Sequence, residues 1–217
     1  METLPQSLNF DKNEEIITNV LDQIMLIGVN SPNKRNLITE TGIIKLNESF
    51  KIFDNSTDIT VAIVHGCGGN FCTGLESNEN ALRKGEELLK VLYELKKPVI
   101  GSLQGYTINF GFQLAMMCDL RAMDETGLIG FGDKNERSHV PNEVYKKMVS
   151  TIGVSKALEL SITNCTFSAE EAKSTGLVNQ VVECGTALGK ALIWAQSVTL
   201  APLQLVTKEK LKILSQI

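Results

Sequence analysis

Two glycine-containing turns hold the residues whose types and spacing suggest chemistry. The first turn covers Gly69–Glu76 (GNFCTGLE) and the second covers Gly105–Gln113 (GYTINFGFQ). Each lies between a strand-like apolar run and a helical pattern, so each leaves N–H groups without partners at the start of a helix. Two such donors that converge on one carbonyl oxygen stabilise the negative charge developing there, by roughly 2.7–4 kcal/mol per donor in acyl-transfer sites. The pair of turns therefore predicts an oxyanion site, although either turn alone is typical of an ordinary tight turn.

Other chemical motifs fail at defining positions. The sequence Gly66-Cys67-Gly68 follows a strand-like run, but Phe71 stands where a dinucleotide-binding loop has its third glycine. Leu75-Glu76 replaces the Lys-Ser/Thr pair of a phosphate-binding P-loop. Ser102 is one position early for a nucleophile elbow. No imidazole is evidently placed to activate a cysteine nucleophile, and the cysteines are expected to be structural thiols.

Composition sets the class of protein. The chain has 217 residues, 43% of them hydrophobic, and a formal net charge of −4. This size suits one domain, and the charge gives no general attraction to nucleic acid or anionic membranes. No apolar run reaches the ~20 residues of a membrane span. The start METLPQSLNFDKNEE lacks the features of a signal or transit sequence, and the final SQI is not a peroxisomal tripeptide. We expect an intracellular protein, cytoplasmic by default.

Cysteine and histidine usage argues against covalent or metal cross-links. The five cysteines are scattered, none forms a C-x-x-C pair, and the chain has only two histidines. A disulfide framework or a zinc site is therefore not expected, and the thiols should be reduced.

Hydrophobic periodicity predicts alternating strands and helices, and hence an α/β fold. A hairpin is expected at Ile16–Asn30, around a turn at Asp22-Gln23. Residues 1–15 read as an N-terminal extension and residues 16–217 as a single domain. Further strands are expected at Asp58–Val64, Val99–Gln104, Asp119–Ala122, Leu128–Phe131 and Leu177–Val182, helices at Leu37–Phe53, Ala81–Leu95, Gly111–Met117, Ser155–Ile162, Ser168–Thr175 and Gly185–Leu214, and a polar loop at Asp133–Asn142.

The order of four segments resembles a known family. These are SPNKRN, DITVAIVHGCGGNFCTGLES, KKPVIGSLQGYTINFGFQLAMMCDLRA and GVSKALELSITNCTFSAEEAKSTGLVNQVV. They are similar to the enoyl-CoA hydratase/isomerase (crotonase) superfamily from about Ile16 onward. The resemblance implies a ClpP/crotonase-like spiral of ββα units with a shortened C-terminal helical region. It also implies a homotrimer or hexamer, an acyl-CoA thioester as substrate without a separate cofactor, and a role in fatty acid metabolism.

The same resemblance assigns roles to backbone groups and to a coenzyme A segment. Leu75 and Phe110 match the two residues whose N–H groups form the family's oxyanion hole. Lys34, Arg35 and Asn36 match the stretch near the adenine and phosphates of CoA, and Thr73 and Gly74 belong to the same binding surface. Asn109 and Phe110 stand where the family has glycines, so two Cβ atoms are expected to narrow the acyl pocket or distort the hole.

The acid–base residues of the family are largely replaced. Gln113 stands at the first glutamate position of hydratases, and glutamine can orient a water but cannot take its proton. Asn135 falls at the second glutamate position, with Asp133 before it and Glu136 after it. Glu143 follows Val140-Pro141, where some subfamilies carry an acid. The carboxylates among these residues are equally consistent with solvated loop charges.

Three functions remain open on this evidence. The first is an acyl-CoA enzyme that stabilises a thioester enolate, acting as an isomerase or as a decarboxylating lyase. The alternative is a catalytically inactive binding or scaffolding module that kept the fold and lost the acids. A thioesterase- or dehalogenase-like relative, in which a carboxylate attacks the substrate, is a third. The sequence does not identify the acyl group.

Overall fold

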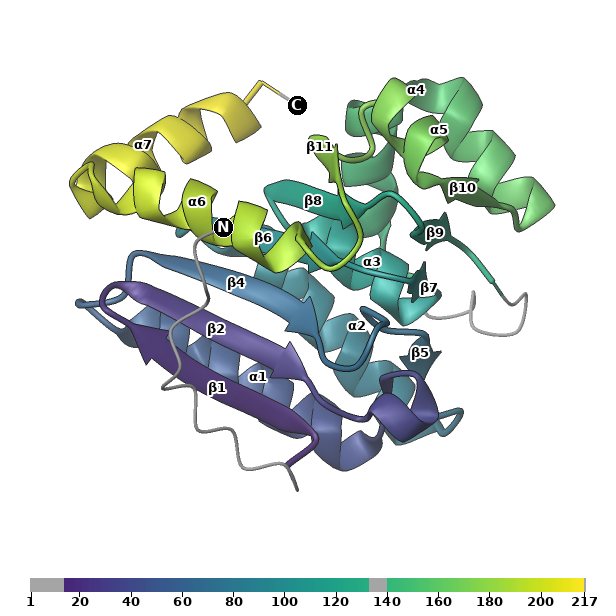
Figure 1. The fold of residues 1–217 in the computed structure, drawn as a ribbon, viewed down its shortest axis with the longest axis horizontal. Coiled ribbons are helices and arrows are strands. Elements are labelled where there is room, and N and C mark those ends of the chain that lie inside the picture. The colour runs from purple at the N-terminus through teal and green to yellow at the C-terminus, as the bar shows by residue number, and fades with distance from the viewer. Residues whose placement is uncertain (1–13, 133–139, 217) are drawn as a thin grey trace.

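The computed structural model describes residues 14–132 and 140–216. Its centre is a six-stranded sheet with the order β1-β2-β4-β6-β8-β11 (Figure 1). The first pair is antiparallel and the other neighbours are parallel. The predicted hairpin is confirmed, and Asp22 at its turn has a φ of 53°. The strands are β1 (Ile16–Leu21), β2 (Ile24–Val29), β4 (Val61–Gly66), β6 (Val99–Leu103), β8 (Leu120–Asp124) and β11 (Gln180–Val182).

Within the described residues the chain repeats a long strand, a short strand and a helix four times. Each long strand joins the six-stranded sheet, and the short strands pair among themselves, β3 with β5 and β7 with β9. The predicted α/β spiral of ββα units is therefore confirmed. The short strands are β3 (Leu37–Ile38), β5 (Gly74–Leu75), β7 (Tyr106–Ile108) and β9 (Leu128–Gly130), and the helices are α1 (Glu40–Asn55), α2 (Glu79–Glu94), α3 (Phe110–Met117) and α4 (Asn142–Thr163).

Alternate side chains of the central strands enter two separate cores. Met25 and Ile27 of β2 point into the larger core, which contains the apolar faces of α1, α2 and α3. Ile24 and Leu26 point to the opposite face, under α6 (Ala187–Thr199), where Ala191 and Ala195 allow a close approach of helix and sheet. Figure 1 shows α6 on one side of the sheet and α1 and α2 on the other. Because the parallel strands are covered on both faces, they read as continuous apolar runs.

The C-terminal third differs from the expectation in one respect. A single helix over Gly185–Leu214 is wrong, because α6 ends at Thr199 and α7 (Leu203–Leu214) begins after Pro202. Proline disfavours helical backbone at the residue before it, so the chain turns at this point. No residue of α7 is buried.

Two further helices agree with local signals. The capping box of Ser168 and Glu171 starts α5 (Ala169–Ser174), directly after β10 (Thr166–Ser168). The helix expected at Ser155–Ile162 is the second half of α4, which is interrupted at Gly153 by a φ of 74° and a ψ of 164°. Asn142, expected in a loop, is the first residue of α4.

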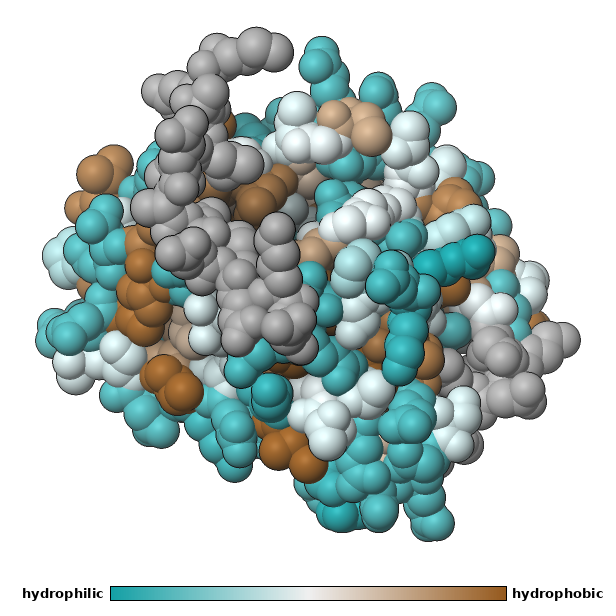
Figure 2. Space-filling model, turned by 60° about the horizontal axis from the view of Figure 1, so that its bottom comes forward, coloured by the Kyte–Doolittle hydropathy of each residue, from teal (hydrophilic) through white to brown (hydrophobic). Residues whose placement is uncertain are grey.

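Exposed apolar residues are scattered over the face of the molecule that Figure 2 shows. Apolar side chains lie there between polar ones. Scattered exposed apolar residues are normal for folded proteins, in contrast to a large continuous patch.

Candidate active site

The two glycine-containing turns lie side by side and are joined through their backbones. The N–H of Cys72 donates to the carbonyl oxygen of Tyr106 at 3.2 Å, and the N–H of Ile108 donates to that of Cys72 at 3.1 Å. A parallel bridge between Cys72 and Thr107 results. The side chain of Asn70 accepts a further bond from the N–H of Tyr106 at 3.1 Å. The two turns are therefore held against each other in the fold.

The N–H of Leu75 points away from β3. Leu75 ends β5, and the next N–H, of Glu76, donates to the carbonyl oxygen of Ile38 in β3 at 2.8 Å. Successive N–H groups of an extended strand point to opposite edges. Because Glu76 uses the edge facing β3, the N–H of Leu75 faces the other edge.

The N–H of Phe110 belongs to the open first turn of α3. The first α-helical bond in α3 runs from the N–H of Gln113 to the carbonyl oxygen of Asn109. The N–H groups of Phe110 and the two residues after it therefore have no partner within the helix, and the helix dipole is positive there. A Cβ at Gly111 would overlap the carbonyl oxygen of Cys72, so only glycine lets the helix start so close to the first turn.

The side chains of Leu75 and Phe110 meet in the interior, against Gly85 of α2. A Cβ built on Gly85 would overlap Cδ1 of Leu75 and would lie 3.0 Å from Cε2 of Phe110. Both side chains are 2% exposed. The benzyl group of Phe110 is thus packed in the core, which leaves its backbone N–H as the group at the helix start. A glycine on the apolar face of the α2 pattern is the sequence signal for this close packing.

Asn109 carries the strain of the second turn and connects neighbouring units. Its φ of 55° and ψ of −121° lie in a region that favours glycine. The side-chain amide donates to the carbonyl oxygen of Thr73 at 3.1 Å and accepts from the N–H of Gly132 at 2.9 Å. These bonds compensate part of the strain. The sequence singled out Asn109 only as a lost glycine, and its bridging role became visible in the fold.

Gln113 is a buried polar group beside this helix start. Its side chain is 4% exposed, and its Oε1 has no hydrogen-bond partner among the described residues. A buried amide oxygen without a partner is costly, by about 1–3 kcal/mol, and functional sites are where such groups are retained. The amide suits the orientation of a water or a substrate, and it cannot act as a general base.

Of the carboxylates proposed from the sequence, only Glu143 lies within the described residues. Glu143 lies in the first turn of α4 and is partly exposed. A hydrogen bond to Glu86 is the main cause that raises the pKa of Lys90 on α2, and the charge of Glu143 adds to it. Glu143 thus interacts with the outer surface of α2, and no hydrogen bond joins it to Gln113. Asp133, Asn135 and Glu136 lie outside the described residues.

The expected coenzyme segment is a left-handed turn fixed to the first glycine-containing turn. Arg35 and Asn36 have φ values of 52° and 58°. Asn36 is fully buried, and its amide donates to the carbonyl oxygens of Cys67 and Asn70 at 2.9 and 2.6 Å. Asn36 therefore shapes the turn from within. Thr73 donates to the carbonyl oxygen of Arg35 at 3.1 Å.

Cationic side chains of this segment remain available at the surface. Lys34 and Arg35 are exposed, and the guanidinium of Arg35 lies 5.9 Å from the ring centre of Tyr106, which is 41% exposed. Two cations beside an exposed aromatic ring suit phosphates and a flat heterocycle. Gly74 has a φ of 148°, a conformation that glycine adopts freely.

The described residues contain neither a metal-ligand cluster nor a membrane-spanning helix. No group of three or more His, Cys, Asp or Glu side chains is placed to hold a metal ion there. No helix in that part of the chain is long and apolar enough to cross a membrane.

Comparisons with known proteins agree on one family. The model of the family described as enoyl-CoA hydratase/isomerase matches residues 20–212. The probable peroxisomal enoyl-CoA hydratase 1 of Arabidopsis thaliana is 30% identical over 188 residues, which cover 81% of this chain and 69% of that protein. The peroxisomal Delta(3,5)-Delta(2,4)-dienoyl-CoA isomerase of the same plant is 25% identical, over 77% of this chain and 68% of its own.

Solved structures show the same fold. The enoyl-CoA hydratase EchA1 of Mycobacterium marinum superposes with a TM-score of 0.84 at 26% identity, covering 93% of this chain and 82% of its own. An enoyl-CoA hydratase subunit of Geobacillus kaustophilus gives a TM-score of 0.85 at 21% identity, covering 94% and 82%.

Proposed function

The chain belongs to the enoyl-CoA hydratase/isomerase family of the crotonase fold, and we propose that it binds an acyl-CoA whose thioester carbonyl accepts hydrogen bonds from the N–H groups of Leu75 and Phe110. The observation that carries this proposal is the backbone pairing of the two turns at Cys72, Thr107 and Ile108. It fixes both donors on one rigid frame. Donors held in advance cost no reorganisation when negative charge develops on the thioester oxygen.

The substrate is the coenzyme A thioester itself, with no separate cofactor. Lys34 and Arg35 supply positive charge for its phosphates, beside the exposed ring of Tyr106. Thr73 and Gly74 bring the chain from this surface to the N–H of Leu75. The expected trimer or hexamer and the cytoplasmic location stay predictions.

The reaction favoured by the site is proton transfer through a thioester enolate, as in an isomerase or a decarboxylating lyase. Hydration of an enoyl-CoA by two carboxylates is disfavoured, because Gln113 has no proton-accepting oxygen of suitable basicity. Glu136 and Glu143 are the candidates to exchange the proton. Glu143 lies in the first turn of α4, whose buried residues pack near α3.

Replacing the amide bond at Phe110 by an ester tests the oxyanion hole, because it removes the N–H and keeps the side chain. We expect acetyl-CoA to bind about tenfold more weakly, while S-ethyl-CoA, which lacks the carbonyl, binds as before. Turnover of any accepted acyl-CoA should fall by about 10²–10³. The same replacement at Phe112 is the matched control. Equal loss with both ligands would contradict the assignment of this N–H to the carbonyl.

Gln113→Glu tests whether a carboxylate at position 113 restores hydration activity. We expect hydration of crotonyl-CoA to rise by about 10²-fold or more, because a general base is restored beside the hole. Gln113→Met, of similar length, should give no such gain. Ordinary hydration rates in the parent protein would show that the importance of Gln113 is misjudged.

A non-catalytic acyl-CoA-binding module is the second candidate, and the amide at position 113 favours it. Thermal stabilisation by CoA and acetyl-CoA without turnover across a panel of enoyl- and malonyl-type acyl-CoAs would support the module. Absence of any binding would contradict both functions.

A further inference from the structure

A second site is built at the other end of α3. A cavity of about 460 Å³ opens between the C-terminal end of α3 and the helices α4 and α7. Its lining combines charged residues with apolar ones, among them Asp119, Lys147, Lys210, Leu120, Ile213 and Leu214. This volume falls within the range of small-molecule sites and far exceeds that of a bare inorganic anion.

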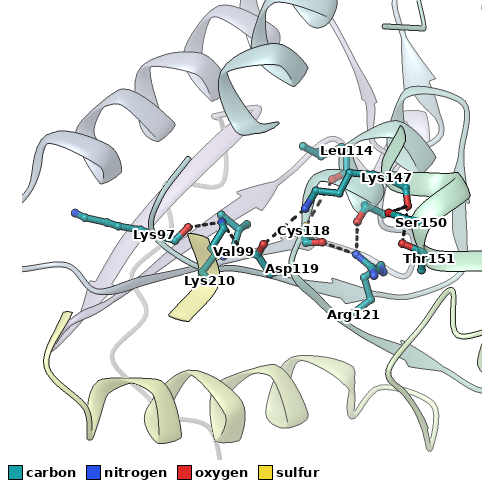
Figure 3. A network of polar contacts seen from close by, with 11 residues as sticks. Lys97, Val99, Leu114, Cys118, Asp119, Arg121, Lys147, Ser150, Thr151 and Lys210 are labelled. Carbon is teal, nitrogen blue, oxygen red and sulfur yellow. Dashed lines mark hydrogen bonds and ion pairs between the residues drawn. The ribbon is translucent and has the colours of Figure 1, made fainter. Parts of the chain in front are cut away.

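Two lysines share one carboxylate in this cavity (Figure 3). Nζ of Lys210 lies 2.7 Å from Oδ2 of Asp119, and Nζ of Lys147 lies 3.7 Å from Oδ1. The side chains of the two lysines are only 9% and 10% exposed. Ammonium groups removed from water to this extent require acceptors for their protons.

The two lysines differ in how far this need is met. Lys210 donates to Asp119 and, at 2.9 Å, to the carbonyl oxygen of Lys97. Lys147 has no hydrogen-bond acceptor among the described residues, because its separation from Asp119 exceeds hydrogen-bond distance. Its ammonium therefore lines the cavity with N–H donors that no acceptor among the described residues satisfies.

The remaining charges leave a positive excess. Arg121 is 5% exposed, and it donates to the carbonyl oxygens of Leu177, Ala115 and Cys118. Burial raises the pKa of the Cys118 thiol to about 12, so the thiol is neutral. Among the described residues that line the cavity, three cations thus face the single carboxylate of Asp119. Carbonyl oxygens at the end of α3 offset part of this charge through Arg121 and leave Lys147 untouched.

The opposite wall is apolar. Ile213 and Leu214 of α7 and Leu120 of β8 line it, and Ile213 is 68% exposed. We propose that this cavity binds a carboxylic acid with a short aliphatic tail, whose carboxylate accepts hydrogen bonds from Lys147 and whose tail lies along α7. An inorganic anion would leave the apolar wall exposed to water, and an uncharged molecule would leave the ammonium without an acceptor.

This site is independent of the proposed enzymatic function. The eight residues of α3 separate it from the N–H of Phe110 by about 11 Å at 1.5 Å per residue. Failure of either proposal leaves the other standing.

Hexanoate is the probe, titrated calorimetrically into the full-length protein. We expect saturable binding at millimolar concentration or below. Lys147→Met should weaken it about tenfold or more, because one charge-assisted hydrogen bond is lost. Lys146→Met, at the exposed neighbouring position, is the matched control and should bind as the parent does. The Lys210–Asp119 pair is retained in both variants, and a single cooperative melting transition in each will show that both are folded.

Two further ligands separate charge from tail. Phosphate and hexanol should each bind at least tenfold more weakly than hexanoate. Equal binding of phosphate would overturn the proposed tail, and equal binding of hexanol would overturn the role of the ammonium. Absence of saturable hexanoate binding, or equal affinity in Lys147→Met, would overturn the site as a whole.

Discussion

The two ends of α3 offer different kinds of groups to a charged ligand. At the N-terminal end, the donors assigned to the thioester are backbone N–H groups, and the nearby side chain of Phe110 is buried in the core. At the C-terminal end, the charges belong to the side chains of Asp119, Lys147 and Lys210. The helix dipole is favourable at both ends, because its positive end lies where an oxyanion is proposed and its negative end lies where the cations gather.

This difference explains what each end tolerates. A backbone donor survives replacement of its own side chain, so the role proposed for Phe110 does not depend on the benzyl group. The donor would be displaced by a side chain at Gly111, where the backbones of the two turns are in close contact. The C-terminal end has the opposite sensitivity, since its geometry depends on which side chains are present.

Asp119→Ala should have the largest effect and should be confined to the C-terminal end. The substitution leaves the ammonium groups of Lys147 and Lys210 buried without a carboxylate, and it removes the acceptor of the Val99 N–H. We expect the free energy of unfolding to fall by about 3–5 kcal/mol, measured by urea denaturation.

The exposed Asp58 offers the control for this prediction. Asp58→Ala should change the free energy of unfolding by no more than about 0.5 kcal/mol. A loss below ~1 kcal/mol in Asp119→Ala would mean that side-chain charge does not organise this end.

Gly111→Ala should disrupt the N-terminal end of α3 through a steric clash, without any change of charge. The added methyl group would overlap the carbonyl of Cys72, so the two turns must separate. We expect a loss of about 1–3 kcal/mol in stability together with weaker acetyl-CoA binding. Gly189→Ala in α6 meets nothing within 4 Å and should stabilise by up to about 1 kcal/mol. Similar outcomes for the two variants would contradict the close approach.

Asn109 allows strain and hydrogen bonding to be compared at one position. Asn109→Gly releases backbone strain of about 1–3 kcal/mol and loses the bonds to Thr73 and Gly132, so its net effect should be near zero. Asn109→Ala loses the same bonds and keeps the strain. We expect its melting temperature to lie clearly below that of the glycine variant, by an amount equivalent to about 1–2 kcal/mol. Equal melting temperatures would show that the turn is unstrained.

The smallest effect should be the dependence of stability on pH that Lys147 adds. Burial lowers the pKa of Lys147 below its ordinary value of 10.5, although Asp119 acts in the opposite direction. Between the lowered pKa and 10.5 the unfolded chain binds more protons than the folded one. This residue therefore makes the free energy of unfolding rise with pH across that window.

Lys147→Met removes this titration. The variant should be more stable than the parent by about 1 kcal/mol at pH 7, with a difference that shrinks as the pH approaches 10.5. Denaturation of both proteins at several pH values, with Lys146→Met as control, measures it. A difference that grows with pH would show that folding raises, rather than lowers, the pKa of Lys147.

Much of the fold was predictable because it follows local patterns. The hairpin at Asp22-Gln23, the capping box at Ser168 and the apolar strand before Gly66 each carry a signal within a few residues. The strand Tyr106–Ile108 was missed because three residues are too few to show alternation. The helix break at Pro202 was missed because apolar residues continue on both sides of it.

The sites were predictable to unequal degrees. The convergence of the two turns followed from their resemblance to a family, since each turn alone has no distinctive residue. The C-terminal cluster could not be predicted, because Asp119 and Lys210 are 91 positions apart and nothing local relates them. Neither the contact of Asn109 with Gly132 nor the meeting of Leu75 and Phe110 at Gly85 is encoded by spacing.

The attachment of α7 has a consequence for how the molecule opens. This helix buries no residue, whereas α6 presses Ala191 and Ala195 against the sheet. Its described anchor is the ammonium of Lys210, held by Asp119 and the carbonyl of Lys97. Segments fastened by so little apolar contact unfold locally, long before the whole chain does. The amide protons of α7 should thus exchange with solvent through local unfolding of this helix. The free energy of that unfolding should depend on the contacts of Lys210 rather than on the stability of the core.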